Sequence, residues 1–419
     1  MHRRDWLRCC LFGAGTALWN GQSSKGHTPK YLDGTDRKAV APSSLAKPEA
    51  LEQIDPVVKQ AIAQKETAGA VVLVLHGDEV IYLRAFGYRR LLPEPVEMTT
   101  DTLFDLASLT KPVATASAIM LLIQDGLLKL NDRVARHWPA FAAGGKEGVT
   151  VEHLLLHTSG LIADNPIADY AAGEQRAWER IAQLKLLDPP GERFRYSDVG
   201  YLVLGRLVEL CSGRKLDIFC RERLWQPLRM KDTAFVLSES QRQRTAATGR
   251  REGRWLQGEV HDPRAALLGG VAGHAGLFST AADLARYCRL LLSNGQLEGR
   301  RLFHEDTLRQ WLTPRAVILG KDSAEQPLRG WRAYGWDVDT PYSTPRGELF
   351  PKDRSFGHTG FTGTSLWLDP ATRTAVIILT NRLHPDEKGN VTPLRRQVGT
   401  LAAQAVGYGR MTVPSNPRK

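Results

Sequence analysis

The sequence predicts one domain of the mixed α/β (α+β) class, in which an antiparallel β-sheet is flanked by helices and carries a mainly helical insertion. Three observations predict this class. Short apolar strand patterns occur early in the chain, at residues 70–75 and 80–83, and return late, at 366–368 and 374–379. The stretch between them, 131–299, has mainly helical spacing. A sheet assembled from both ends of the chain fits this order.

Length and composition agree with such a domain. The 419 residues are 42% hydrophobic and 24% charged, which is ordinary for a folded globular protein. The net charge is +11, of which +4 belongs to residues 1–30, and the sequence contains no lysine-rich run. Nucleic acid is therefore not an expected partner, although the basic balance suits a surface near anionic cell-envelope polymers.

The amino terminus resembles an export signal. Residues 3–8, RRDWLR, are similar to the twin-arginine signal, and an apolar run follows at 9–19, too short to span a bilayer. We expect a signal peptide over 1–30, a linker over 31–50 and the folded domain over 51–410. The resemblance implies an exported protein, periplasmic or extracellular, without a stable membrane span in its mature form. A basic start without signal function is the alternative.

Cysteines and cofactor motifs are sparse. Beyond the signal region only Cys211, Cys220 and Cys288 remain, an odd number without a Cys-x-x-Cys pair. Neither a disulfide framework nor a zinc site is expected. The sequence also contains no His-Glu-x-x-His, Gly-x-Ser-x-Gly or phosphate-binding loop pattern. We expect no metal and no cofactor.

The remaining elements follow in chain order. A helix is expected at 56–66, and the two early strands form a hairpin through residues 76–79. Five helices are expected in the insertion, and then a strand and a final helix frame the late strands. These elements are 151–157, 175–184, 199–210, 217–224, 281–292, the strand 334–338 and the helix 394–406.

The chain is organised around residues 104–112, FDLASLTKP, which lead into the apolar stretch 113–123. A helix that begins at or just before Ser108 places Lys111 on the same face, because residues three apart on a helix are neighbours. Serine is a good helix cap, and Pro112 is tolerated in a first turn. We expect Ser108 to be a nucleophile and Lys111 to accept its proton.

The Ser-x-x-Lys pattern alone is weak, because it occurs three times. The other two copies lie at 44–47, in a polar segment with nearby proline, and at 212–215, across a glycine. Neither copy opens a long apolar helix. Context therefore selects Ser108.

A second candidate segment is 193–201, RFRYSDVGY, which lies just before an expected helix that Ser197 or Asp198 can cap. Tyr196 would then lie at a loop–helix junction. A phenol beside an ammonium can ionise well below its usual pKa, so Tyr196 is expected to carry a proton between nucleophile and leaving group. The alternative is a core aromatic.

A third candidate segment is 356–365, FGHTGFTGTS. Its glycines, Gly357, Gly360 and Gly363, exclude a helix, and within an edge strand they let a substrate backbone lie close. The structural alternative is a tight β-turn.

In this third segment, His358 and Thr359 would point hydrogen-bonding groups at the substrate, with Gly360 allowing close approach. The backbone N–H of Phe361, together with that of Ser108, would bind the oxyanion of a tetrahedral intermediate. We expect five residues to bind substrate: Asp198, His358, Thr359, Gly360 and Phe361.

Taken together, the three segments resemble the motifs of the serine β-lactamase and penicillin-binding protein family, and most closely its class C-like branch, whose second motif starts with tyrosine. Supporting phrases occur at 154–161, 227–233 and 273–280. The resemblance covers about residues 55–405. It implies a β-lactamase/transpeptidase-like fold, acylation of Ser108, proton transfer shared by Lys111 and Tyr196, and a substrate held along the third motif.

Two positions depart from the family pattern. Asp198 stands where asparagine is common, and a carboxylate accepts but does not donate hydrogen bonds. His358 stands where lysine is common, and histidine is mostly neutral at pH 7, which weakens the fixed charge that attracts a substrate carboxylate. Both departures disfavour β-lactams and peptide C-termini. His157 and His274 lie in turns of small residues and are expected to be structural.

The sequence thus predicts an exported serine hydrolase that forms an acyl-enzyme with ester or amide substrates, either small molecules or compounds derived from peptidoglycan. A D-alanyl-D-alanine carboxypeptidase or a β-lactamase is one alternative. A non-catalytic muropeptide-binding protein on the same fold is another. The sequence does not predict an oligomeric state.

Overall fold

The computed structural model describes residues 48–409, and its centre is a nine-stranded antiparallel sheet with the order β10-β11-β12-β13-β14-β15-β1-β2-β3. The first strand pairs with the last, so that Ala70 lies opposite Thr380 and His76 lies opposite Thr374. The predicted sheet built from both chain ends is confirmed. Its strands are β1 (Gly69–His76), β2 (Glu79–Arg90), β3 (Val96–Glu97), β10 (Arg315–Lys321), β11 (Pro327–Ala333), β12 (Trp336–Asp339), β13 (Phe356–Thr359), β14 (Ser365–Asp369) and β15 (Thr374–Thr380).

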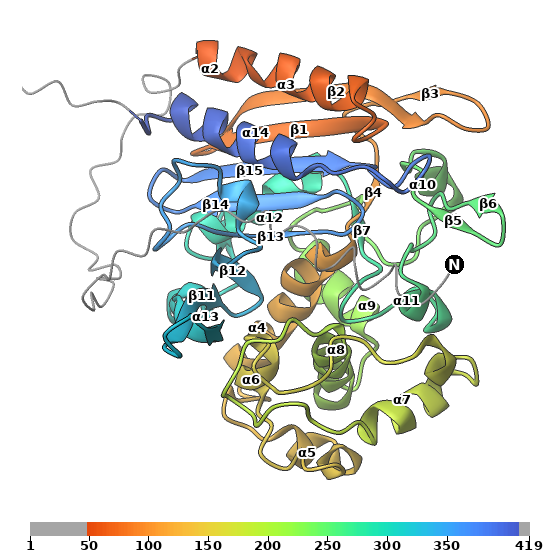
Figure 1. Ribbon diagram of the computed structural model, residues 1–419, viewed down its shortest axis with the longest axis vertical. Coiled ribbons are helices and arrows are strands. Elements are labelled where there is room, and N and C mark those ends of the chain that lie inside the picture. The colour runs from red at the N-terminus through yellow and green to blue at the C-terminus, as the bar shows by residue number, and fades with distance from the viewer. Residues whose placement is uncertain (1–47, 410–419) are drawn as a thin grey trace, which may run out of the picture. The chain divides into compact units, whose positions relative to one another are not determined.

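Side chains that alternate along the central strands separate two apolar layers. On β1, Val72 and Val74 pack against the helices α2 (Pro48–Glu52), α3 (Ile54–Ala63) and α14 (Thr392–Ala405). Val71 and Leu73 face the larger core, which includes α12 (Ala281–Leu292). Figure 1 shows α2, α3 and α14 at the top, together on one side of the sheet. The sheet is therefore covered on both faces.

The first helices of the insertion, α5 to α8, form the lower part of Figure 1, and α8 packs against the central helix α4 (Ser117–Gln124). The expected helices are present, with small shifts of their ends. The helical elements are α5 (Val134–His137), η4 (Pro139–Ala142), α6 (Val151–Leu155), η5 (Ile167–Tyr170), α7 (Glu174–Ala182), α8 (Asp198–Ser212), α9 (Leu216–Cys220), η6 (Arg221–Trp225), α10 (Glu239–Gln243), α11 (Pro263–Leu267), α13 (Glu305–Leu312) and η7 (Thr344–Arg346).

Several strands had no sequence prediction. They include β10 and β11 of the main sheet and three short two-stranded ribbons, in which residues are few and apolar alternation is weak. The ribbons are β4 (Phe104–Asp105) with β7 (Phe278–Ser279), β5 (Arg250–Arg251) with β6 (Arg254–Trp255), and β8 (Gln296–Leu297) with β9 (Arg300–Arg301).

The helix expected to begin at Ser108 is divided into three types of turn. A 3₁₀ turn, η2 (Ala107–Leu109), is followed by a π-helical segment, η3 (Lys111–Ala116), and then by α4 (Ser117–Gln124). Ser108 is not the helix cap, because it lies inside the first turn. Pro112 has no N–H for a regular helical bond, which fits the wide π turn around it.

Among residues 48–409, one helical stretch, 107–124, is long and apolar enough to cross a membrane, and 83% of it is buried inside the fold. It is the core helix of this domain. The predicted signal peptide over 1–30 and most of the predicted linker over 31–50 lie outside the described residues, and these boundaries stay predictions.

Candidate active site

Ser108 and Lys111 are brought together as expected. Lys111 Nζ donates a hydrogen bond to Ser108 Oγ at 3.0 Å and another to the His274 carbonyl oxygen at 3.1 Å. It also lies 2.6 Å from Asp198 Oδ1, while the lysine side chain is fully buried. The amine therefore has three acceptors around it, one of them charged.

The backbone before Ser108 is fixed by Asp105. One carboxylate oxygen accepts from the Ala107 N–H at 2.8 Å and the other from the His261 N–H at 2.7 Å. Ala107 has a φ of +46°, which is strained for a residue with a side chain and occurs mainly where surrounding contacts impose it. Burial raises the pKa of Asp105 to about 6, and these two N–H groups act against that shift. The carboxylate thus holds the turn that presents Ser108.

Tyr196 lies beside this pair. Its ring stacks on His157 at a centroid distance of 4.5 Å, and Lys111 Nζ lies 4.9 Å from its centre. Burial and the negative charge of Asp198 raise the pKa of Tyr196 well above its usual value, and hydrogen bonding to Ser108 opposes them less strongly. The expectation of a lowered pKa is therefore wrong. The Asp198 carboxylate lies beside the amine that was expected to lower this pKa, and its negative charge acts in the opposite direction.

Asp198 is the first residue of α8, and its neighbour Ser197 provides the helix cap by accepting from the Gly200 N–H at 3.0 Å. The Asp198 side chain is 20% exposed and forms the ion pair with Lys111. We expected it to bind substrate. The structure places its carboxylate against the Lys111 amine, and the role in substrate binding stays a prediction.

The third motif lies on β13 and the turn after it. We expected an edge strand, but β13 lies inside the sheet, between β12 and β14. Its pairing with β12 consists of one residue pair, Asp337 with Gly357. The part of β13 that carries His358 and Thr359 thus continues beyond this pair toward Gly360.

The turn after β13 is bonded to the segment before the nucleophile. Thr362 Oγ1 donates to the Asp105 carbonyl oxygen at 2.7 Å, and Thr364 Oγ1 donates to that of Leu106 at 3.0 Å. A Cβ on Gly360 would lie 2.4 Å from the Leu106 oxygen, so only glycine fits. These contacts bring Phe361, which is 36% exposed, next to the Ser108 turn.

His358 is buried, and its Nδ1 lies 2.9 Å from the Thr359 carbonyl oxygen. Burial, together with the charges of Arg332 and Lys111, lowers the pKa of His358 well below its usual value. The imidazole is therefore neutral, and the third motif carries no fixed positive charge at this position.

With this geometry in place, comparison with known proteins decides the family. The chain matches the family described as Beta-lactamase over residues 54–400. The chain belongs to the beta-lactamase family. The resemblance inferred from the three motifs is confirmed, and so is the β-lactamase/transpeptidase-like fold class.

Individual relatives agree with this membership. A protein from Escherichia coli (strain K12) named "Putative D-alanyl-D-alanine carboxypeptidase" is 32% identical over 373 residues, covering 80% of this chain and 84% of the relative. N-acetylmuramyl-L-alanine amidase from Bacillus subtilis (strain 168) is 32% identical over 383 residues, covering 81% and 84%. A solved penicillin-binding protein homologue from Caulobacter crescentus has a TM-score of 0.67 at 24% identity, covering 87% of this chain and 100% of that chain. The chain is a serine hydrolase of this family.

Two buried arginines near the site of this beta-lactamase family member could not be predicted from the sequence. Arg332 on β11 is fully buried and forms an ion pair with buried Asp337 on β12. Arg395 on α14 donates to the carbonyl oxygens of Gly360 at 2.9 Å and Thr364 at 2.7 Å. Both depend on tertiary contacts, so neither spacing nor composition could reveal them.

The two histidines set aside as structural connect segments of the site. His157 Nδ1 accepts from the Ser197 N–H at 3.0 Å, next to Tyr196. His274 Nε2 lies 3.0 Å from Asp262 Oδ1, and its carbonyl oxygen accepts from Lys111. Each therefore positions a segment that carries part of the site.

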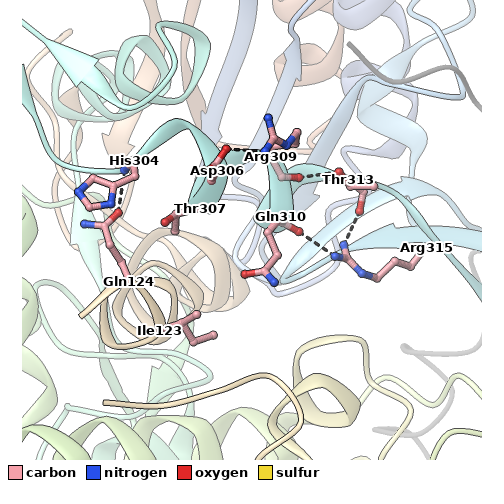
Figure 2. A pocket seen from close by; sticks show the side chains of 9 residues that line it. All are labelled: Ile123, Gln124, His304, Asp306, Thr307, Arg309, Gln310, Thr313 and Arg315. Atoms are coloured by element: carbon pink, nitrogen blue, oxygen red, sulfur yellow. Dashed lines mark hydrogen bonds and ion pairs between the residues drawn. The ribbon is translucent and has the colours of Figure 1, made fainter. Parts of the chain in front are cut away.

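A groove of about 670 Å³ lies elsewhere, between the end of α4 and α13 (Figure 2). Its polar groups are bonded to one another. Arg309 pairs with Asp306, and Arg315 donates to the carbonyl oxygens of Thr313 and Gln310. Because it is at the opposite end of the helix from Ser108, we assign it no part in the reaction.

Among residues 48–409, no group of three or more His, Cys, Asp or Glu side chains is arranged to hold a metal ion. The three cysteines of this region, Cys211, Cys220 and Cys288, are free thiols.

Proposed function

We propose that Ser108 is the nucleophile of this serine hydrolase and that it forms an acyl-enzyme with ester or amide substrates, including compounds derived from peptidoglycan. The observation that carries the proposal is the 3.0 Å contact between Lys111 Nζ and Ser108 Oγ, with Tyr196 beside both. The names of the Escherichia coli and Bacillus subtilis relatives, a carboxypeptidase and a muramyl-alanine amidase, support the peptidoglycan-derived class.

In the proposed reaction the Ser108 oxygen attacks the substrate carbonyl, and the backbone N–H groups of Ser108 and Phe361 bind the oxyanion. Within residues 48–409 neither N–H donates to another backbone carbonyl, so both remain available. Loss of one such donor costs about 10²–10³ in rate in hydrolases of this kind.

Substrate preference follows from the third motif. His358 is neutral, and Arg332 is fully buried against Asp337, so neither presents a positive charge to a substrate carboxylate. A substrate without a carboxylate next to the scissile bond does not need such a positive charge for binding. We therefore expect simple esters to react faster than D-Ala-D-Ala peptides or β-lactams.

We also propose that the protein is exported through the predicted signal over residues 1–30. The cell-wall activities that the relatives' names describe support this location. The twin-arginine resemblance of residues 3–8 supports the route.

The decisive experiment is covalent labelling with a fluorescent fluorophosphonate, which reacts with activated serines. The wild-type protein should be labelled and S108A should not, because the variant lacks the nucleophile. Turnover of p-nitrophenyl acetate, a D-Ala-D-Ala peptide and nitrocefin, measured side by side, ranks the substrates. Labelling that persists in S108A would exclude this nucleophile, and faster release from the peptide would reverse the expected ranking.

A further inference from the structure

The protons of the resting site present a problem for catalysis. Lys111 is paired with the Asp198 carboxylate at 2.6 Å, as an ammonium would be, and an ammonium has no lone pair with which to accept the proton of Ser108. Tyr196 does not replace it, because its raised pKa keeps the phenol neutral. A group that can take a proton from Lys111 is needed before serine can attack.

We propose that Asp198 is the final acceptor in a proton relay that runs from Ser108 through Lys111 to Asp198. This inference rests on the proposed function of Ser108. As the Ser108 oxygen bonds to the substrate carbonyl carbon, its O–H proton moves to Nζ, and one Nζ–H proton moves to Asp198 Oδ1. The carbonyl π pair becomes the oxyanion. Lys111 is thus an ammonium before and after the step, and Asp198 changes from carboxylate to carboxylic acid.

The second half of the reaction returns the proton. When the tetrahedral intermediate collapses, the leaving group takes a proton from the Lys111 ammonium, directly or through the Tyr196 hydroxyl. Asp198 then returns its proton to Nζ, so the ion pair is restored and no proton is gained or lost. The same relay serves the water that hydrolyses the acyl-enzyme.

Burial favours this exchange. Lys111 is fully buried and Asp198 is only 20% exposed, and an ion pair removed from water loses much of its advantage over the neutral pair. A bound substrate that covers the remaining exposed part of Asp198 would strengthen this effect. Asp198 Oδ1 has no hydrogen-bond partner of regular geometry, although Nζ lies 2.6 Å away, so this oxygen can still accept a proton.

The charges around Asp198 act in both directions. Asp164 carries a second carboxylate close by, since burial and the negative charge of Asp198 raise the pKa of Asp164 to about 6, and the two carboxylates repel each other. Arg264, which lies 3.3 Å from Asp164, reduces this repulsion. The amino terminus of α8 favours the carboxylate, because Asp198 is its first residue. Charges of both signs therefore act on the ion pair.

The test is D198N, which keeps the size of the side chain and matches the residue common in the family. If Asp198 only fills space or binds substrate, asparagine should serve as well. If Asp198 accepts the proton, kcat/KM for p-nitrophenyl acetate should fall about 100-fold or more, because general acid–base groups contribute about 10²–10⁴. Fluorophosphonate should still label Ser108 of D198N slowly, which separates a failed relay from a wrong nucleophile. D198E should recover part of the lost rate.

A second measurement needs no variant. Rates of acylation measured in mixtures of H₂O and D₂O should depend on the deuterium fraction along a curve in the wild type, because two protons move together. D198N should give a straight line. Asp132→Asn is the matched control, because Asp132 is a buried, ion-paired aspartate of the insertion, bonded to Arg136 and His137. It should leave kcat/KM and the isotope dependence unchanged. Wild-type kcat/KM in D198N, or a straight line in the wild type, would overturn the proposal.

Discussion

The charge states of single residues in this site matter as much as their shapes for how the site is held together. Asp105 is 2% exposed, yet it accepts two backbone N–H groups, and its pKa is raised to about 6 because burial outweighs those bonds. Asp198 and Lys111 likewise form an ion pair, with Nζ 2.6 Å from Oδ1. The residue types could be identified from the sequence, but their protonation states depend on neighbours that only the fold supplies.

Asp105 gives a prediction for stability against pH. Its pKa in the folded protein lies above the unfolded value of 3.8, so folding favours the protonated acid. The stability contributed is complete below about pH 4 and is lost as the pH rises to about 6, by about 3 kcal/mol at 1.36 kcal/mol per pKa unit. Urea unfolding of the wild type and of D105N between pH 3 and 8 measures this. The difference in unfolding free energy should decrease across that interval.

An exposed carboxylate supplies the comparison. Asp306 has an 83% exposed side chain, and D306N should differ from the wild type by an amount that hardly changes with pH. An increase of the Asp105 contribution from pH 4 to 6 would contradict the assigned direction.

At the scale of elements, the proposed active site depends on two turns that pack against each other. The turn after β13 is bonded through Thr362 and Thr364 to the carbonyl oxygens of Asp105 and Leu106. This contact aligns Phe361 with Ser108 from segments about 250 residues apart. The three motifs could be found in the sequence, but the threonines that join two of them could not, because threonine in a turn is common and its partner is remote.

Gly360 tests this contact. In G360A the new Cβ would lie 2.2 Å from Thr364 Oγ1 and 2.4 Å from the Leu106 oxygen, which forces the two turns apart. We expect kcat to fall at least about 10²-fold, as for loss of an oxyanion donor, and stability to fall by about 1–3 kcal/mol. Initial rates and thermal unfolding measure the two effects.

Gly148 is the matched control. It has no positive φ, and no heavy atom lies within 4 Å of a Cβ built there, so G148A should retain wild-type activity and stability. Wild-type turnover in G360A would show that the separation of the turns does not matter for the reaction.

For the molecule as a whole, the most informative feature is that the far ends of the fold support the centre. Arg395 belongs to the last helix, α14, yet its guanidinium fixes the Gly360 turn at the carbonyl oxygens of Gly360 and Thr364. Burial lowers the pKa of Arg395 to about 9, because the guanidinium is removed from water. The two carbonyl oxygens replace part of that hydration. The final helix therefore takes part in positioning the site.

R395M removes both hydrogen bonds while it keeps an apolar stem. We expect thermal stability to fall, because the carbonyl oxygens of Gly360 and Thr364 each lose a hydrogen bond from a charged donor, worth about 1.5–3 kcal/mol, and kcat to fall with it. R396M is the control next to it in sequence, since Arg396 is 60% exposed and its ion pair is with exposed Glu348. R396M should match the wild type. Equal effects of the two substitutions would contradict a specific role for Arg395.

The sequence was most informative where local pattern and fold agree. The hairpin of β1 and β2, the helix α12 and the late strands β14 and β15 have clear apolar periods and were predicted. The π turn after Ser108 was not predicted, because an apolar helix pattern does not distinguish turn types. Strands β10 and β11, of which β11 carries Arg332, have mixed polar sequences and partial exposure, so no apolar periodicity marks them.

The pairing of β1 with β15 has a consequence during synthesis. The ribosome completes residue 76 about 300 residues before it makes residue 374, the partner of His76. At about 5–20 residues per second this interval lasts about 15–60 s. During this interval one edge of the apolar strand β1 has no hydrogen-bonding partner, because β15 has not yet been made. An unpaired strand edge can pair with another chain. This edge therefore stays open to such pairing until the last strand, β15, has been made.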